Sequence, residues 1–192
     1  MSQPIVVIVR HAEKPEPDGP HGVDHHGHPS GHGLTPRGWS RAGALAARMA
    51  FAGATGDETA RPAGTRPPGD IVRPQRVYAT ATDPHHASDR PRLTAHGIAK
   101  RLDLDMLDHL GRGDEAQLAA EVLASDEPTL IVWDHGHIPT LAHAFPLDPA
   151  TAVPDAWPED RFDLYWVLTP GDGGYTLTIS PQELLAGDSP SA

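Results

Sequence analysis

The 192-residue chain contains no cysteine, so disulfide bonds and thiolate chemistry are both excluded. Aromatic residues make up only 5% of it, and no aromatic-rich ligand pocket can be placed in the sequence. The apolar run 5–9 is far too short to span a membrane, and the first four residues lack the basic region of a signal peptide. We therefore expect a cytoplasmic protein without a membrane partner.

Basic residues are scarce as well. Lysine and arginine number 15 against 26 acidic residues, which gives a formal net charge of −11. Such a surface repels nucleic acid, because non-specific binding depends on cationic groups that neutralise phosphates. A small anionic substrate would need a local group of arginines to overcome this field. We therefore expect no nucleic-acid partner.

Proline and glycine are abundant, with 21 and 19 residues, which indicates long loops around the core. The segments 15–33 and 52–74 have no helical or strand pattern. The length fits one domain that covers residues 1–192, and the 38% of hydrophobic residues is enough for one core. We expect the loops 12–33 and 52–74 to be insertions over the functional site.

Short apolar runs alternate with helical patterns along the chain. Apolar, β-branched runs predict buried strands at 4–9, 76–79 and 129–133, and a terminal hairpin at 163–169 and 175–179. Helices are predicted at 37–51 (with Thr35 as N-cap), from 86 or 87 to 102, at 114–124 and at 137–145. This order predicts an α/β three-layer sandwich, with a mostly parallel central sheet, helices on both faces and an antiparallel edge.

Two of the predicted strands end in similar polar residues. The first runs into Arg10 and His11, and the strand 129–133 runs into Asp134 and His135. In open α/β sheets, ligands bind outside the carboxyl ends of the strands. If both strands are central and parallel, these side chains meet at one edge of the sheet.

Arg90 belongs to the same predicted group, because it starts the helix that follows the strand 76–79. The guanidinium offers a planar fork of donors that matches phosphate oxygens. A neutral imidazole is a competent nucleophile, and an arginine-lined pocket stabilises the charge of the transition state. The residues therefore predict a site for phosphoryl transfer.

Four segments carry a resemblance to a known family. Val9-Arg-His-Ala-Glu-Lys14 is similar to the Arg-His-Gly-Glu signature of the histidine phosphatase superfamily, which includes phosphoglycerate mutase-like proteins. Leu34-Thr-Pro-Arg-Gly38 resembles its Leu-Thr-x-x-Gly motif. Tyr78-Ala-Thr80 with Arg90-Pro-Arg-Leu-Thr-Ala95 resembles its third segment, and Val132-Trp-Asp-His-Gly136 resembles its second His-Gly motif. The matches occur in the family's order, between residue 5 and about residue 145.

The resemblance implies a phosphoglycerate mutase-like fold and a phosphohistidine mechanism. His11 would attack phosphorus in line, and Arg10, Arg90 and His135 would hold the transferring group. The amide of Gly136 could add a donor at the start of a short helix. Water would then release phosphate, and neither a metal nor another cofactor is needed. The implied activity is that of a phosphoric monoester hydrolase acting on a small phosphorylated metabolite.

The sequence also departs from the family's pattern. Ala12 replaces the usual glycine, and Lys14 replaces the usual serine or threonine. The segment that carries the general acid in many relatives is short here. The candidate proton donors are Glu13, Asp105, Asp108 and Asp134, and the sequence does not choose among them. Without such an acid, the enzyme would prefer good leaving groups, such as phosphoanhydrides or phosphohistidine.

Two other functions stay open, namely a phosphomutase or isomerase of a phosphosugar and a non-catalytic module that binds a phosphate ligand. The histidine-rich loop 21–32 invites a metal-site interpretation, but its irregular spacing in a Gly/Pro-rich segment favours a lid over the site. His85, His86 and His96 are further candidates for contact with the substrate. The sequence leaves the oligomeric state open.

Overall fold

The computed structural model describes residues 3–52, 71–84 and 87–192. Most of the predicted 52–74 insertion therefore lies outside the described residues. The same holds for His85 and His86, so their predicted contact with substrate stays a prediction.

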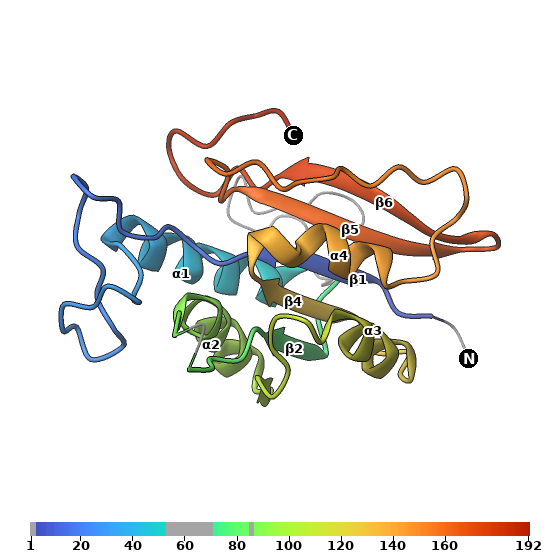
Figure 1. Cartoon of the computed structure of the whole chain (residues 1–192), viewed down its shortest axis with the longest axis horizontal. Helices are drawn as coiled ribbons and strands as arrows, with labels where there is room; N and C mark the ends of the chain where they lie inside the picture. Colours follow the sequence, from blue (N-terminus) through green and yellow to red (C-terminus); the bar gives the residue numbers. More distant parts are fainter. Residues whose placement is uncertain (1–2, 53–70, 85–86) are drawn as a thin grey trace.

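The described residues form a single mixed sheet with helices on both of its faces (Figure 1). The strand order is β3-β2-β4-β1-β5-β6. In chain order the elements are β1 (Val6–Arg10), α1 (Pro36–Phe51), β2 (Arg76–Ala79), α2 (Arg90–Leu102), β3 (Met106–Leu107), α3 (Glu115–Leu123), β4 (Thr129–Trp133), the 3₁₀ turn η2 (His135–His137), α4 (Ile138–His143), β5 (Leu164–Gly171) and β6 (Gly174–Pro181).

The sheet is parallel over β1 to β4 and antiparallel where β5 and β6 join it. This arrangement confirms the predicted parallel sheet with an antiparallel edge. Strand β1 pairs with β4 in parallel, and Arg10 lies opposite Trp133 at the end of the ladder. Because both strands end at the same level, the residues that follow them emerge at one edge of the sheet.

Alternate side chains of strand β1 enter the two hydrophobic clusters on opposite faces of the sheet. Val6 and Ile8 join the cluster packed under α3 and α4, whereas Val7 and Val9 join the cluster packed under α1 and α2. All residues of β1 and β4 are buried, as expected for central strands of a sheet covered on both sides. The predicted three-layer α/β sandwich is confirmed.

The start of each helix near the sheet edge has a local cause. Thr35 is the N-cap of α1, and its side-chain oxygen accepts a hydrogen bond from the Gly38 amide, as predicted. Helix α2 begins later than predicted, at Arg90, because Pro91 fits only the first turn of a helix. Helix α4 is shorter than predicted, because the 3₁₀ turn η2 precedes it and the chain leaves the helix after His143.

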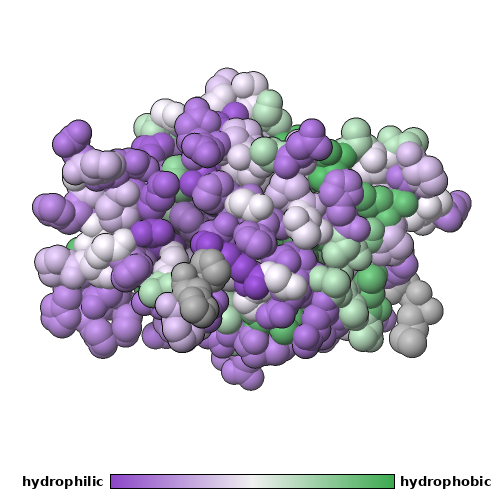
Figure 2. Space-filling model, viewed as in Figure 1, coloured by the Kyte–Doolittle hydropathy of each residue, from purple (hydrophilic) through white to green (hydrophobic). Residues whose placement is uncertain are grey.

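The surface agrees with the acidic composition. Figure 2 shows hydrophilic residues over most of the face seen in Figure 1, with hydrophobic residues confined to smaller areas. Among the described residues, no helix is long and apolar enough to cross a membrane.

Candidate active site

His11 follows β1 and is almost completely buried, with 2% of its surface exposed. Its Nδ1 lies 2.8 Å from the carbonyl oxygen of Ala12. Since a carbonyl only accepts hydrogen bonds, Nδ1 carries the proton and Nε2 keeps its lone pair. Burial lowers the pKa of His11 to about 3, and the charges of Arg10 and Arg90 act in the same direction. The imidazole is therefore neutral at physiological pH, as a nitrogen nucleophile must be.

Arg10 presents one edge of its guanidinium without a partner. Its Nη1 donates to carbonyl oxygens of the loop 158–161, and its Cζ lies 3.8 Å from the ring centroid of Phe162. Its Nε and Nη2 are buried and have no hydrogen-bond partner among the described residues. Burial lowers the pKa of Arg10 to about 10, so it stays charged at neutral pH. Unpaired buried donors are costly, and this pair has the spacing that binds two oxygens of an oxyanion.

Arg90 connects the site to the histidine-rich loop. Its Nη2 donates to the carbonyl of Gly31 at 2.6 Å, and its Nε donates to the carbonyl of Gly33 at 3.3 Å. Its Nη1 donates to the hydroxyl of Ser88 at 3.2 Å. A guanidinium has five N–H groups, so two remain for a ligand. Arg90 thus ties the 12–33 loop to the sheet edge while it lies close enough to His11 to lower that residue's pKa.

His135 and Asp134 complete the group around His11. The rings of His11 and His135 meet edge to face, with centroids 6.3 Å apart. The pKa of His135 is lowered by burial and by the charge of Arg10, and its Nδ1 is buried with no hydrogen-bond partner among the described residues. One ligand atom from each of His11, Asp134 and His135 lies within 4.8 Å of the other two.

Asp134 is held as an anion next to the two histidines. Its Oδ2 accepts from Arg112 at 2.7 Å, and its Oδ1 accepts from the amide of Gly136 at 3.1 Å. Burial acts to raise the pKa of Asp134, but the charge of Arg112, the neighbouring imidazoles and the hydrogen bond from the Gly136 amide together outweigh it, so this pKa is lowered. The Gly136 amide is therefore already used inside the protein, and its predicted role in binding phosphate stays a prediction.

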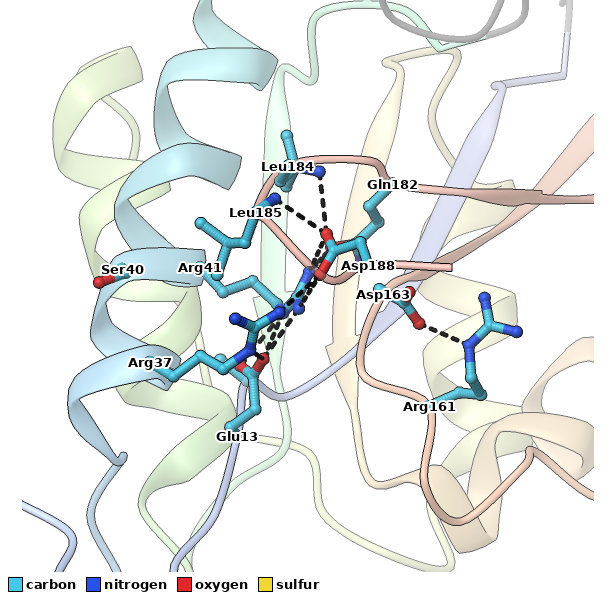
Figure 3. A network of polar contacts seen from close by, with 12 residues as sticks. Glu13, Arg37, Ser40, Arg41, Arg161, Asp163, Gln182, Leu184, Leu185 and Asp188 are labelled. Atoms are coloured by element: carbon cyan, nitrogen blue, oxygen red, sulfur yellow. Dashed lines mark hydrogen bonds and ion pairs between the residues drawn. The ribbon is translucent and has the colours of Figure 1, made fainter. Parts of the chain in front are cut away.

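Glu13 does not face this group. Its carboxylate accepts from Arg41 at 2.8 Å and from Arg37 at 3.1 Å, and both arginines also bond Asp188 near the C-terminus. Figure 3 shows the two carboxylates meeting the two guanidinium groups between α1 and the C-terminal segment. Glu13 therefore belongs to a structural ion network and is not available as a proton donor.

The other three candidate proton donors are Asp105, Asp108 and Asp134. Asp108 accepts from Arg92 at 2.7 Å, and Asp105 is exposed before β3. Of the four candidates, Asp134 is the one that lies beside both histidines. Because its pKa is lowered, it has no proton to give at neutral pH. None of the four candidate proton donors therefore offers a proton beside His11.

The other residues that the sequence suggested as substrate contacts or metal ligands are not part of the group around His11. His96 is exposed on α2 and, with His25, lines a cavity of about 270 Å³ whose lining does not include His11. Within the described part of the chain, the histidine-rich loop brings no three potential metal ligands together, whereas His11, Asp134 and His135 do meet.

Sequence reasoning missed the contribution of the segment before β5. Phe162 lies under Arg10, with its ring centroid 6.0 Å from that of His11. Phe162 also lines a cavity of about 570 Å³, but the lining of that cavity includes the Glu13 ion network and neither Arg10 nor His11. The carbonyls of 158–161 that hold Arg10 are backbone groups, so no side-chain motif could reveal them. Arg112, the partner of Asp134, likewise stands in a segment without a recognisable motif.

Comparison with known proteins gives similarity at the level of structure. No protein-family model matches the chain, and no curated protein matches its sequence. A SixA protein of Nakamurella multipartitia, described as a putative phosphohistidine phosphatase, superposes with a TM-score of 0.52 at 16% identity, over 94% of this chain and 98% of that one.

Two mycobacterial structures are similar to about the same degree. A glucosyl-3-phosphoglycerate phosphatase, in complex with VO3, has a TM-score of 0.52 at 14% identity, over 92% of this chain and 97% of that one. A structure called mycobacterial hydrolase 1 has a TM-score of 0.50 at 14% identity, over 91% of this chain and 96% of that one. These likenesses confirm the predicted fold.

Proposed function

We propose that this protein is a phosphatase of the histidine phosphatase type, which hydrolyses a small phosphorylated metabolite through a phosphohistidine intermediate on His11. The observation that carries the proposal is the pairing of a buried, neutral His11 with the unpartnered Nε and Nη2 edge of Arg10. The similarity in fold to phosphatases supports it. The net charge of −11 favours a small-molecule substrate over nucleic acid.

In the first step, Nε2 of His11 attacks phosphorus in line with the bond to the leaving group, that bond breaks, and the leaving group departs with the bonding electron pair. The hydrogen bond from Nδ1 to the Ala12 carbonyl fixes the tautomer and stabilises the ring as it becomes cationic. Arg10 binds two phosphoryl oxygens through its open edge, and the free N–H groups of Arg90 and a ring N–H of His135 bind the others. Water then attacks phosphorus and the bond between phosphorus and Nε2 breaks. Inorganic phosphate leaves, the remaining water proton passes to solvent, and His11 returns to its neutral form. No step of this mechanism uses a metal or a cofactor.

The set of acids favours one class of substrate. Glu13 and Asp108 are paired with arginines, and Asp134 is held ionised beside the histidines. A leaving group that departs without protonation suits this site, because none of these candidate acids supplies a proton there. We therefore propose donors with good leaving groups, such as phosphoanhydrides or phosphohistidine.

The proposal is tested with a labelled small phosphoryl donor such as acetyl phosphate. We expect an acid-labile, base-stable phosphoenzyme and release of inorganic phosphate, both lost in His11→Ala. His143→Ala, which changes an exposed histidine at the end of α4, is the matched control and should keep both.

Other outcomes would change the assignment. Full phosphatase activity in His11→Ala would contradict the proposal. An isomerised phosphosugar without released phosphate would indicate a mutase, and tight binding of phosphate esters without a phosphoenzyme would indicate a binding module.

A further inference from the structure

We infer that His11, Asp134 and His135 also form a binding site for a divalent transition-metal ion such as Zn²⁺, and that this ion excludes the phosphoryl group. The inference concerns the group of residues proposed above for phosphoryl transfer, but it does not depend on turnover. It would make a metal ion an inhibitor of this site.

The three residues offer the ligand types that zinc prefers. Two imidazoles and one carboxylate, with a further position left open, are a common set in zinc sites that also bind water or another ligand. Their candidate ligand atoms all lie within 4.8 Å of one another. The carboxylate of Asp134 is ionised, and Nε2 of His11 carries a lone pair because Nδ1 donates to Ala12. The Nδ1 of His135 is buried without a hydrogen-bond partner in the described part of the chain.

The contacts behind these ligands resemble those of metal sites. Histidine ligands usually donate their second ring nitrogen to a backbone carbonyl or a carboxylate, and carboxylate ligands are themselves hydrogen-bonded. His11 donates to the carbonyl of Ala12, and Asp134 accepts from Arg112 and from the Gly136 amide. These contacts fix two of the three ligands in place before any ion arrives.

Only a small movement is needed to close the site. Ligand atoms around one zinc ion lie roughly 3.3 to 3.6 Å apart, because each zinc–ligand bond is about 2.0 to 2.2 Å long. The ligand atoms here are no more than 4.8 Å apart, so a movement of about 1.5 Å or less by one side chain closes the site. His135 is the side chain that can do so, since it is 27% exposed and its Nδ1 gives up no hydrogen bond.

The surrounding charges make the site weaker than a dedicated metal centre. Arg10 and Arg90 lie close enough to lower the pKa of His11, and they repel a cation while they attract an anion. The ion and the phosphoryl group also need the same lone pair on Nε2 of His11. Metal binding and phosphate binding should therefore be mutually exclusive.

The experiment is a titration of the whole protein with Zn²⁺, followed by calorimetry, without and with saturating inorganic phosphate. Nitrilotriacetate holds free Zn²⁺ at the same low concentrations in both titrations, so that phosphate does not remove the ion from solution. We expect one Zn²⁺ per chain and weaker apparent binding in phosphate. His135→Ala, and the near-isosteric Asp134→Asn, should each weaken zinc binding by at least about tenfold. Thermal unfolding of each variant checks that it is folded.

The histidine-rich loop provides the matched control. In a triple variant, His25→Ala, His26→Ala and His28→Ala remove three exposed histidines of that loop and should leave zinc binding unchanged. Loss of binding in this variant, with binding retained in Asp134→Asn, would overturn the inference. So would zinc binding that phosphate does not weaken.

The two proposals fail in different ways. A phosphoenzyme on His11 in a protein that binds no Zn²⁺ would overturn the metal site alone. Zinc binding that depends on Asp134 and His135, in a protein that forms no phosphoenzyme, would support the metal site and overturn the proposed phosphatase.

Discussion

Burial sets the chemistry of individual residues at the sheet edge. The imidazole of His11 is neutral because it is removed from water, and its proton sits on Nδ1 because Ala12 accepts it there. Arg10 is equally buried, yet two of its nitrogens have no partner among the described residues. The lone pair of His11 can attack the phosphorus of a phosphoryl group, and the unpartnered N–H groups of Arg10 can bind its oxygens.

The neutral state of His11 predicts how stability depends on pH. Its pKa is about 3 in the folded protein, against about 6.5 for an unfolded chain. The unfolded chain therefore binds more protons between these values, so the free energy of unfolding falls as the pH falls below about 6.5. Urea unfolding at pH 7 and pH 5 measures this change. His11→Gln, which does not titrate, should show a smaller pH dependence, and an equal dependence would contradict the assigned state of His11.

The open edge of Arg10 predicts that lysine cannot replace it. An ammonium group carries the charge but cannot bind two oxygens through a planar fork. We expect Arg10→Lys to lower kcat for a phosphoryl donor by about 10²- to 10³-fold, the size of effect seen when one donor to a transition-state oxyanion is lost. Arg73→Lys, at an exposed position, is the control. A kcat within a few-fold of the wild-type value in Arg10→Lys would exclude the proposed contact.

At the scale of elements, the in-register pairing of β1 with β4 explains why His11 and His135 meet. The sequence predicted these strands, because their apolar runs are unambiguous, and it predicted α1 from Thr35. It did not predict that Glu13 turns away into an ion network, because the partner Asp188 lies near the other end of the chain. It also missed the carbonyl contacts of Arg10, because backbone groups leave no mark in a sequence.

The network of Glu13, Arg41 and Asp188 predicts a large effect on stability. The side chains of Arg41 and Asp188 are each 2% exposed, and removing Asp188 leaves the buried Arg41 with Glu13 as its remaining carboxylate partner. We expect Asp188→Ala to lower the free energy of unfolding by about 1 to 3 kcal/mol, the cost of losing buried hydrogen bonds between charged groups, measured in urea. Asp172→Ala in the β5–β6 turn is exposed and should change it little. Equal stabilities of the two variants would show that the network does not hold α1 to the C-terminal segment.

For the whole molecule, the sequence predicted the fold class better than the details of the site. Buried strands that alternate with helices along a chain have few stable folds other than a parallel sheet covered by helices. The observed strand order and the similarity to solved structures are consistent with this fold class. The acidic composition also has a consequence at this scale. A molecule with a net charge of −11 binds a phosphate dianion only where arginines gather, so one specific anion site should dominate.

Such a site predicts that inorganic phosphate stabilises the entire fold. A ligand that binds only the folded state adds about 2.7 kcal/mol of stability at a concentration of 100 Kd. We expect saturating phosphate to raise Tm by several degrees in the wild type, with sodium chloride at equal ionic strength as the control. Arg10→Ala should show no such rise. If its rise equals that of the wild type, phosphate binds elsewhere.

The central claim is that His11 becomes phosphorylated. Its most direct test is mass spectrometry of peptides from protein quenched in base during reaction with acetyl phosphate. We predict one phosphoryl group, on the peptide that contains His11 and not on the peptide that contains His135. Phosphorylation of His135 instead, or phosphate release without any phosphohistidine, would contradict the account.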